Sequence, residues 1–381
     1  MAGRTVKKSG DNWYYVLTYG KKENGKPMQY KKRGFKTKKE AQKALHELEQ
    51  SLITGSYIKP NKILFGDYLL NQWLEDKQTK VKKQTLKTYR WIVEKHIVPS
   101  LGHIEMNQIT PMAIQKLYNR LTKDRILSDE NIQKVHTLIN DSLKKAERWG
   151  VILRNPASLV DRPKAEKKEI SVWNVQEVQT FLKYAKDYNR YYIAFLLALT
   201  TGMRQGEILG LRWKDIDFSQ GCLRITQTLS VDGKELLPYT KTRAGTRTVD
   251  LPDETIDALL IHKKIIDKEK LEVGIDQYQD YGLVVCTSTG TPTNKSNIRR
   301  TFKAIIQKAK LPKIRFHDMR HTHATLLLLQ GVNPKIVSER LGHADVRITL
   351  DTYSHLLPSM QKETAKNFGK MLFSDDDTAN A

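Results

Sequence analysis

Cysteine is scarce in this chain, with only Cys222 and Cys286 among its 381 residues. Two thiols are too few for a disulfide framework or for a zinc site built from cysteine ligands. Each lies in a strand-like run, so we expect both to be buried free thiols, which suits a reducing compartment.

Long apolar segments are missing as well. The longest, Tyr192–Leu199, has the length of a buried helix and falls short of the roughly 18 residues that cross a bilayer. The N-terminal run Met-Ala-Gly-Arg-Thr-Val-Lys-Lys lacks the apolar core of a secretion signal. We therefore expect a cytoplasmic protein with no membrane partner.

Positive charge is what the chain has in excess. Lys and Arg number 65 against 42 Asp and Glu, which gives a formal net charge of +23. Such an excess indicates a polyanionic partner, with nucleic acid favoured over membrane, and a merely soluble basic surface is the alternative. A chain of 381 residues is also too long for one ordinary core, so two or three domains are expected.

The positive charge is dense in a small N-terminal unit, which we place at residues 1–58. Trp13–Tyr19 and Met28–Phe35 are strand-like, and Asn24-Gly25 between them is a hairpin signal. Thr37 then opens a helix, with Glu40 completing a capping box. A basic sheet backed by one helix can lie in a DNA groove, and a solvated hairpin without ligand is the alternative. The residues expected to contact DNA are Lys31, Lys32 and Arg33.

Residues 64–160 are predicted to form a helical domain between two linkers, 56–64 and 161–168. No motif with chemistry of its own occurs in this domain, which favours a clamp or a packing module. Its helix signals are, in order, apolar periodicity at 65–77 and 84–98, Thr110-Pro111 as N-cap and first-turn proline, Ser128 as a helix start, and Asn155-Pro156 as the end of the bundle.

Residues 170–373 are predicted to form a mixed, mainly α domain, and residues 374–381 a disordered tail. Asn174 and Glu177 make a second capping box. The fold class is therefore multidomain α+β. The expected elements are helices near 175–186, 190–200, 294–310 and 319–330, one from Asn333-Pro334 and one leading to Tyr353, and strands near 222–229, 235–239 and 246–251.

Four motifs in this last domain carry chemistry. Thr200–Glu207 places an arginine at a helix start after a glycine turn, and Tyr239–Arg247 is a basic loop between predicted strands. The third and fourth motifs are His317–His323 and Leu341–His343, and Tyr353 comes ten residues after His343. Any one of these motifs would be weak, and only the ordered set indicates a site. The candidate catalytic residues are Arg204, Lys241, His317, Arg320, His343 and Tyr353.

This ordered set resembles that of the tyrosine recombinases, and more narrowly of lambda-type integrases from phages and mobile elements. That family carries an Arg in a Thr-Gly-x-Arg-x-x-Glu run, a hairpin Lys, His-x-x-Arg, Leu-Gly-His and a downstream Tyr, and each is present here in order. The resemblance covers nearly the whole chain. It implies an arm-type DNA-binding domain at 1–58, a helical core-binding domain at 64–160 and a catalytic domain at 170–373.

The residue types suit attack on a phosphodiester. Arg offers a planar fork of donors for phosphate oxygens, which is the role expected of Arg204 and Arg320. His317 and His343 can donate hydrogen bonds to the same centre or move a proton. Glu207 is expected to orient an active-site arginine or the helix turn.

The resemblance implies that Tyr353 is the nucleophile and that Lys241 protonates the departing 5′ oxygen. A phenol has a pKa of about 10, so it needs a positive field or a base to attack at neutral pH. The product would be a 3′-phosphotyrosine link, which keeps the phosphoryl group activated for the reverse step. No ATP, metal or other cofactor is expected.

A zinc site is the competing interpretation of His317 and His321, which stand at positions i and i+4. Asp318 stands where the zinc motif requires Glu, and Arg320 would oppose a cation, so this interpretation is disfavoured. We expect structural roles for His321, His323 and His355, and phosphate-contacting or solvated roles for Arg243 and Arg247.

The resemblance implies a site-specific recombinase that integrates, and can excise, a mobile element in a bacterial chromosome, which places it at the nucleoid. Its partners would be double-stranded DNA attachment sites with core and arm sequences, three further copies in a homotetramer, an excisionase and a host DNA-bending protein. The segment from Leu356, Leu357 and Met360 to Phe373 would dock on a neighbouring subunit or pack within its own. Two alternatives stay open: a type IB topoisomerase-like nicking-closing enzyme, and a catalytically silent DNA-binding regulator.

Overall fold

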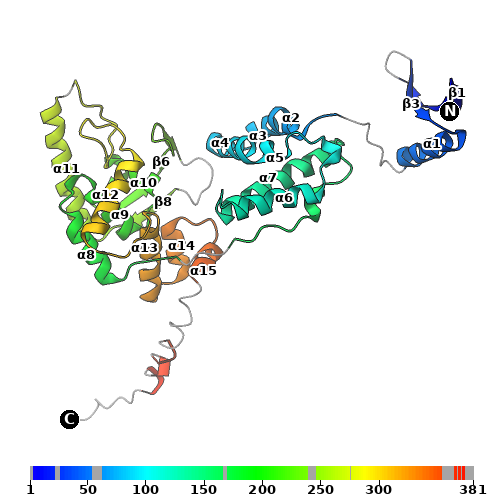
Figure 1. Cartoon of the computed structure of the whole chain (residues 1–381). Helices are drawn as coiled ribbons and strands as arrows, with labels where there is room; N and C mark the ends of the chain where they lie inside the picture. Colours follow the sequence, from blue (N-terminus) through cyan, green and yellow to red (C-terminus); the bar gives the residue numbers. More distant parts are fainter. Residues whose placement is uncertain are drawn as a thin grey trace, which may run out of the picture. The chain divides into compact units, whose positions relative to one another are not determined.

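The computed structural model describes residues 3–21, 26–53, 62–165, 170–238, 246–274 and 276–353, with short helical pieces at 364–366, 368–369 and 371–373. The chain divides into two compact units, Met1–Lys167 and Lys168–Ala381 (Figure 1). Among these residues, no helix has the length and apolar character that a bilayer crossing requires.

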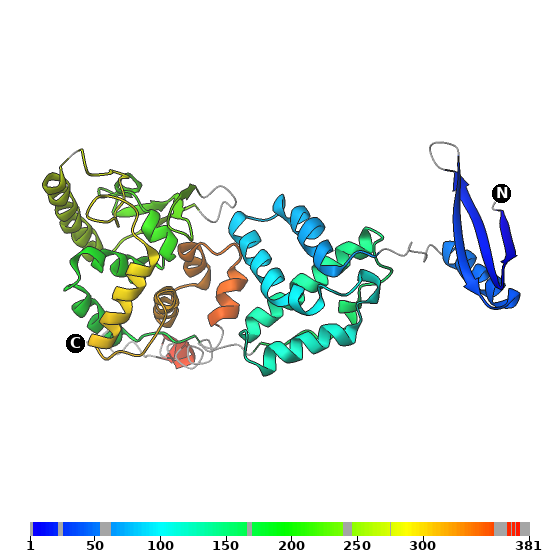
Figure 2. The same cartoon turned by 45° about the horizontal axis from the view of Figure 1, so that its top comes forward.

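The first unit begins with a three-stranded antiparallel sheet in the order β1-β2-β3. Strand β1 is Arg4–Ser9, β2 is Asn12–Lys21 and β3 is Pro27–Phe35, and helix α1, Lys38–Ile53, packs against the sheet (Figure 2). Strand β1 was not predicted. The predicted turn at Asn24-Gly25 lies outside the described residues.

The predicted capping box at the start of α1 is confirmed. Thr37 Oγ1 accepts from the backbone N–H of Glu40 at 3.2 Å, and Glu40 Oε2 accepts from the backbone N–H of Thr37 at 3.3 Å. The sheet and α1 enclose a small apolar core of their own. Its buried members are Tyr15, Leu17, Leu45 and Leu48.

The rest of the first unit is helical and has a separate, larger core. Thr110 caps helix α6 as predicted, because its hydroxyl accepts from the backbone N–H of Ala113 at 3.2 Å. Two predicted helices are present but contain π-helical turns. The elements are α2 Phe65–Tyr68, η1 Leu69–Trp73, α3 Leu74–Gln78, α4 Lys83–Ile92, η2 Val93–Ile97, α5 Val98–Leu101, η3 Met106–Gln108, α6 Pro111–Lys123, α7 Asp129–Arg148 and η4 Pro156–Leu159.

The second unit is mainly helical, with two small antiparallel sheets in the orders β4-β5-β8 and β6-β7. The predicted strand at 222–229 is two strands, β5 and β6, with different partners. The helices are α8 Val175–Ala185, α9 Asn189–Thr201, α10 Gln205–Gly210, η5 Trp213–Asp215, α11 Asp253–Val273, α12 Lys295–Lys308, α13 Asp318–Leu329, α14 Pro334–Leu341 and α15 Val346–Tyr353. The strands are β4 Ile216–Asp217, β5 Cys222–Ile225, β6 Gln227–Leu229, β7 Leu236–Pro238 and β8 Arg247–Asp250.

Helix α9 is the central helix of the second unit. Its residues Ile193–Leu199 are buried on every face, and it contacts α8, α10, α11 and α13. An apolar helix without a polar face has to be enclosed by other elements, which is the reason for this position. Because the chain leaves α9 at Thr201, the motif that follows it starts from a rigid base. The aromatic core around α9 includes Trp173, Phe181, Phe195, Phe302 and Phe316.

Helix α11 was missed by the sequence analysis. Its buried positions include polar Thr255 and His262 beside Leu259 and Ile266, so the apolar stripe is interrupted in the sequence. His262 is accommodated because its Nε2 lies 2.8 Å from the backbone carbonyl oxygen of Val284. A buried polar side chain of this kind is satisfied by a distant segment, which periodicity cannot reveal.

The two cysteines are free, but their expected environments need correction. Cys222 lies on β5 and is only half-buried, because β5 is short and its face there is partly open. Cys286 is buried, yet it forms an isolated bridge with Pro292 and not a strand.

Candidate active site

Arg204 is positioned by a tight turn between two helices. Helix α9 ends at Gly202, whose φ is +65°, a left-handed conformation that favours glycine. A Cβ at this position would lie 2.6 Å from Leu341 and 2.7 Å from His323, so a side chain there would clash. The chain can therefore turn sharply and place Arg204 as the N-cap of α10.

Glu207 connects two arginines at the base of the site. Its carboxylate is 1% exposed, and it accepts from Arg204 Nη1 at 2.8 Å and from Arg247 Nη2 at 2.9 Å. Burial alone would raise the pKa of Glu207, but Arg247 and then Arg204 lower it to about 2. Glu207 is therefore ionised at neutral pH and forms an ion pair with Arg204.

Arg247 was expected either to contact DNA phosphate or to be solvated. Its side chain is 7% exposed, so the solvated alternative is wrong. Its Nε donates to the backbone carbonyl of Arg340 at 2.7 Å, and Nη2 donates to Glu207. The reason is tertiary: the end of α14 packs on β8 and encloses the guanidinium.

Arg320 is the most deeply buried cation of the site, at 3% exposure. Its Nη1 donates to the backbone carbonyl of Gly202 at 2.7 Å, while its Nη2 is buried and has no hydrogen-bond partner among the described residues. Burial, and then the nearby charge of Arg204, lower the pKa of Arg320 to about 9. Two guanidinium groups this close, one with a buried donor not bonded to protein, form a suitable place for an anion.

His343 follows the left-handed Gly342 (φ +69°) at the end of α14. Its Nδ1 lies 2.8 Å from Thr349 Oγ1, and the carbonyl of Gly342 accepts from Arg204 Nη2 at 3.4 Å. Burial, and then the charge of Arg320, lower the pKa of His343 to about 4. The imidazole is therefore neutral at physiological pH and has one N–H to donate.

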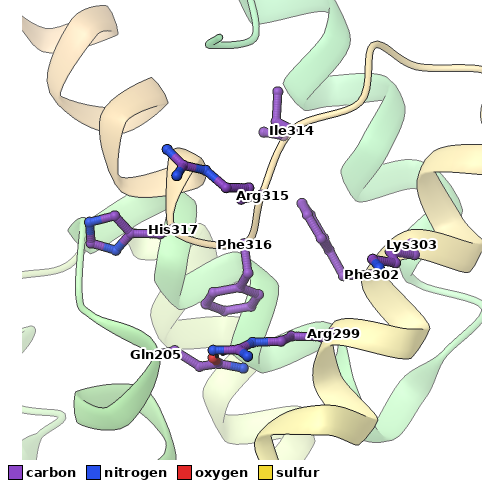
Figure 3. A pocket seen from close by; sticks show the side chains of 8 residues that line it. All are labelled: Gln205, Arg299, Phe302, Lys303, Ile314, Arg315, Phe316 and His317. Atoms are coloured by element: carbon purple, nitrogen blue, oxygen red, sulfur yellow. Dashed lines mark hydrogen bonds between the residues drawn. The ribbon is translucent and has the colours of Figure 1, made fainter. Parts of the chain in front are cut away.

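His317 lies at the start of α13 and is exposed. Its ring meets that of His321 edge to face, with centroids 5.1 Å apart. His317 also lines a cavity of about 520 Å³, in which Arg299 and Arg315 add positive charge (Figure 3). Arg299 donates to Gln205, the residue after Arg204, at 3.2 Å, so this basic cavity borders the candidate site.

Tyr353 ends helix α15 and is 3% exposed. Its ring packs in a small apolar cluster with Leu328 and Leu341. Its hydroxyl lies 2.7 Å from Nδ1 of His321. Burial raises the pKa of the Tyr353 phenol, and the charge of Arg320 offsets part of that shift. The hydroxyl is therefore protonated at neutral pH in this arrangement.

His321 and His323 differ although both were expected to be structural. His323 is buried between helices: its Nδ1 lies 2.8 Å from the carbonyl of Leu199, and its Nε2 accepts from Arg340 at 3.2 Å. This is a packing role, as expected. His321 instead contacts the hydroxyl of Tyr353, and that contact was missed. Its place next to Arg320 in the His317–His323 motif was the only available signal.

Several predicted residues are not tested by this geometry. Lys241, Arg243 and His355 lie outside the described residues, as does most of the segment that follows Tyr353. Within the described parts of the chain, no group of three His, Cys, Asp or Glu side chains is arranged to hold a metal ion.

The basic residues of β3 form a second, separate site candidate. Lys31, Lys32 and Arg33 are all exposed. Lys31 Nζ lies 4.7 Å from the ring centroid of Tyr14, and the guanidinium of Arg33 lies 5.7 Å from the same centroid. The aromatic ring holds two cations side by side on an open surface.

Three family models match this chain in succession. Residues 4–52 match an Arm DNA-binding domain, 65–122 match the phage integrase N-terminal SAM-like domain, and 171–360 match the Phage integrase family. The last range contains all of the candidate catalytic residues.

Among curated proteins, the chain is 32% identical to a "Tyrosine recombinase XerC-like" protein of Caldanaerobacter subterraneus subsp. tengcongensis, over 96% of this chain and 97% of that protein. It is 27% identical to the ICEBs1 integrase of Bacillus subtilis, over 88% of this chain and 91% of that protein.

Among solved structures, the Tn1549 transposon integrase in complex with transposon right end DNA matches with a TM-score of 0.66 and 22% identity, over 77% of this chain and 98% of that one. A lambda integrase dimer bound to a core site matches with a TM-score of 0.60 and 18% identity, over 91% of this chain and 93% of that one. At these identities the likeness establishes the fold.

Proposed function

Because this chain belongs to the phage integrase family of tyrosine recombinases, we propose that Tyr353 is its nucleophile and that Arg204 and Arg320 bind the scissile phosphate. The enzyme is a site-specific DNA recombinase of the integrase type. The observation that carries the residue assignment is the convergence of three distant motifs. Arg204 bonds to the loop before His343, Arg320 bonds to the turn before Arg204, and Tyr353 bonds to the helix of Arg320.

The proposed phosphate site is formed by arginine side chains that are already buried, or partly buried, before DNA binds. Attack by the phenol places additional negative charge on the non-bridging oxygens. The Nη2 of Arg320, which has no hydrogen-bond partner in the described part of the chain, is a fixed donor for one of them. Arg204 is held by Glu207 and supplies a second guanidinium. His343 and His317 supply neutral donors at the rim. Preorganised donors of this kind lower the barrier because they need no rearrangement during the reaction.

Bond changes in the proposed reaction are balanced without an external energy source. The bond from Tyr353 Oη to phosphorus forms while the phenol gives its proton to a base, and the bond from phosphorus to the 5′ oxygen breaks. Lys241 is the proposed donor of the proton that the 5′ oxygen takes up. One phosphodiester has been exchanged for another, so a 5′ hydroxyl of a second strand can reverse the step and complete the exchange.

Capture of the covalent intermediate tests this assignment. The substrate is a nicked duplex carrying the junction between the element and its flanking DNA, because the nick releases a short strand and prevents religation. The wild type should give a protein–DNA adduct that survives denaturing electrophoresis, with the link mapped to Tyr353. Tyr353→Phe should bind the same duplex and give no adduct. An adduct on another residue, or one that persists in Tyr353→Phe, would refute the assignment.

Roles for the remaining parts follow from the same family membership. We propose three domains, with 1–58 on arm sites and with 64–160 and 170–373 around the core site, acting as a homotetramer on two DNA sites. One solved relative is a lambda integrase tetramer bound to a Holliday junction, which supports this assembly. An excisionase and a host DNA-bending protein are proposed partners. The proposed location is the bacterial cytoplasm, at the nucleoid, where the substrate DNA lies.

A plasmid-relaxation assay and the adduct assay together separate the remaining alternatives. A type IB topoisomerase-like enzyme would relax supercoiled plasmid that lacks the junction sequence, whereas the proposed recombinase would not. A silent regulator would bind the junction duplex without forming an adduct. The proposed location predicts that the protein crosslinks to chromosomal DNA in cells carrying the element.

A further inference from the structure

Helix α15 is tied to the candidate site by two hydrogen bonds between histidines and hydroxyl groups. His343 Nδ1 lies 2.8 Å from Thr349 Oγ1, and His321 Nδ1 lies 2.7 Å from Tyr353 Oη. Thr349 and Tyr353 are four residues apart, so they lie on the same face of α15, one turn from each other. The two contacts fix the rotation of α15 and with it the direction of the phenol oxygen.

Among the described residues, His321 is the side chain that forms a hydrogen bond with the Tyr353 hydroxyl. Tyr353 is 3% exposed, so bulk water does not reach the phenol freely. Neighbours of the ring such as Leu328, Val337 and Leu341 are apolar and cannot take a proton.

We propose that His321 is a catalytic residue, whose Nδ1 accepts the phenol proton of Tyr353 during DNA cleavage and returns it during rejoining. The proposal rests on the function proposed above. As the Oη–phosphorus bond forms, the proton passes from Oη to Nδ1, and the electron pair of the broken bond leaves with the 5′ oxygen. Attack by a 5′ hydroxyl reverses these changes, and the proton goes back to Oη.

The electrostatic surroundings of His321 agree with an acceptor role. Burial, and then the neighbouring His317, lower the pKa of His321 to about 4, so the ring is neutral and can leave Nδ1 unprotonated at physiological pH. Because the pKa of Tyr353 is raised, the proton moves only while the Oη–phosphorus bond is forming. The groups facing His321 are Arg315, His317, Asp318 and Arg320 from its own segment, Tyr353 from α15, and His343 from the loop before α15.

His317 is the rival for this role, and its position argues against it. Its ring reaches His321 edge to face at 5.1 Å and is exposed beside the basic cavity, and no hydrogen bond joins it to the phenol. His317 lines the basic cavity (Figure 3), whereas the ring of His321 lies 5.8 Å, centroid to centroid, from the ring of Tyr353. We therefore expect His317 to contact the scissile phosphate or the departing 5′ oxygen.

The matched substitution is His321→Asn. The asparagine amide can occupy the position of Nδ1 and keep a hydrogen bond to Oη, but it cannot accept a proton. The assay is single-turnover cleavage of the nicked junction duplex with sulfur in place of the bridging 5′ oxygen at the mapped cleavage position. Because a thiolate leaves without protonation, the phenol proton is the only one that must move during cleavage of this substrate.

We expect the wild-type rate on the sulfur substrate to be nearly flat from pH 6 to pH 8. His321→Asn should be slower by about 10²-fold or more near pH 7, because a positioned base typically contributes about 10²–10⁴-fold. Its rate should rise about tenfold per pH unit, because the phenol must then ionise before attack. Lys241→Ala should be slow on ordinary DNA and restored by sulfur, which separates the leaving-group proton from the phenol proton.

His103→Asn is the control, because His103 is exposed and lies outside the candidate site; it should leave the rate and pH profile unchanged. A His321→Asn profile parallel to the wild type, or rescue of that variant by sulfur, would overturn the proposal.

If the variant does not fold, the solvent isotope effect on wild-type cleavage tests the proposal. Wild-type cleavage of the sulfur substrate should be slower in D2O than in H2O, and equal rates would overturn the proposal. Absence of any wild-type adduct would instead refute the proposed function.

Discussion

Two regions of this molecule are rich in arginine and lysine, and they use the same charge in opposite ways. On β3, Lys31, Lys32 and Arg33 are exposed, and two of them lie over the ring of Tyr14. In the second unit, Arg320 is buried and bonded to a backbone carbonyl, and Arg247 is buried against Glu207.

The difference shows what burial does to a cation. An exposed lysine keeps its hydration and attracts DNA through a field that salt screens, so it contributes affinity without requiring a fixed geometry. A buried arginine has lost its water and needs acceptors in fixed positions, so it costs stability unless those acceptors are present. The first arrangement suits binding to many phosphates, and the second suits one phosphate held in one geometry.

Removal of the most deeply buried cation should have the largest effect. Arg320→Ala is expected to slow formation of the Tyr353 adduct by about 10²–10³-fold, since it deletes a preorganised donor for the charge that develops on phosphate. Affinity for the junction duplex should change little. Arg224, exposed on β5, provides the control, because Arg224→Ala should cleave at the wild-type rate. Comparable rates for Arg320→Ala and wild type would remove Arg320 from the site.

Neutralising the carboxylate beneath the arginines is the next strongest test. Glu207→Gln leaves Arg247 buried without its counter-charge, which typically lowers the free energy of unfolding by about 3–5 kcal/mol. We expect a lower denaturant midpoint for the second unit and slower cleavage, because Arg204 also loses its ion pair with Glu207. The exposed Glu254 gives a matched Glu254→Gln control with an unchanged midpoint. An unchanged denaturant midpoint for Glu207→Gln would mean that the ion pairs of Glu207 contribute nothing to the stability of the second unit.

As the pH falls, protonation of His323 should lower the free energy of unfolding of the second unit before Glu207 becomes protonated. The pKa of His323 is lowered from 6.5 to about 4 by burial and then by Arg340, so the unfolded state binds a proton before the folded state does. Its stabilising effect is complete above pH 6.5 and is lost as the pH falls from 6.5 to about 4. Glu207, with a pKa of about 2 against 4.5, loses its contribution only below pH 4.5.

Thermal melting of the full chain between pH 8 and pH 4 measures this difference. The midpoint of the second unit should fall between pH 6.5 and pH 4, because His321 and His343 share the lowered pKa of His323. His323→Gln should make that fall less steep while lowering the midpoint at pH 8. His103→Gln, an exposed position, should follow the wild-type curve. A wild-type midpoint that is constant over this range would contradict the assigned burial of His323.

The exposed cations of β3 should give the smallest and most gradual effect. Replacing Lys31, Lys32 and Arg33 with Ala should reduce the slope of log affinity against log salt for duplex DNA by up to about 3, because each phosphate contact contributes about 0.9. Cleavage of the nicked core duplex should be unaffected at saturating protein. Lys39→Ala with Lys43→Ala, on exposed positions of α1, is the control and should change the slope less. Equal slopes for both variants would remove β3 from the DNA surface.

Local signals predicted much of the fold correctly. The capping boxes at Thr37 and Asn174 and the capped start at Thr110 are present, because a cap involves residues only three positions apart. The apolar run in α9 was recognised as a buried helix for a similar reason. Helix α11 was missed because the partner that satisfies its buried His262 comes from a distant loop.

The sequence by itself determined the order of the motifs, the residue types in the candidate site and the positions where helices start, since each depends on spacing along the chain. Only the tertiary structure decided which of those polar groups are buried and what they touch. Arg247 became an internal partner of Glu207, and His321 reached the hydroxyl of Tyr353. Burial and hydrogen-bond partners are set by segments 40 and 32 positions away in the chain, and no local pattern contains that information.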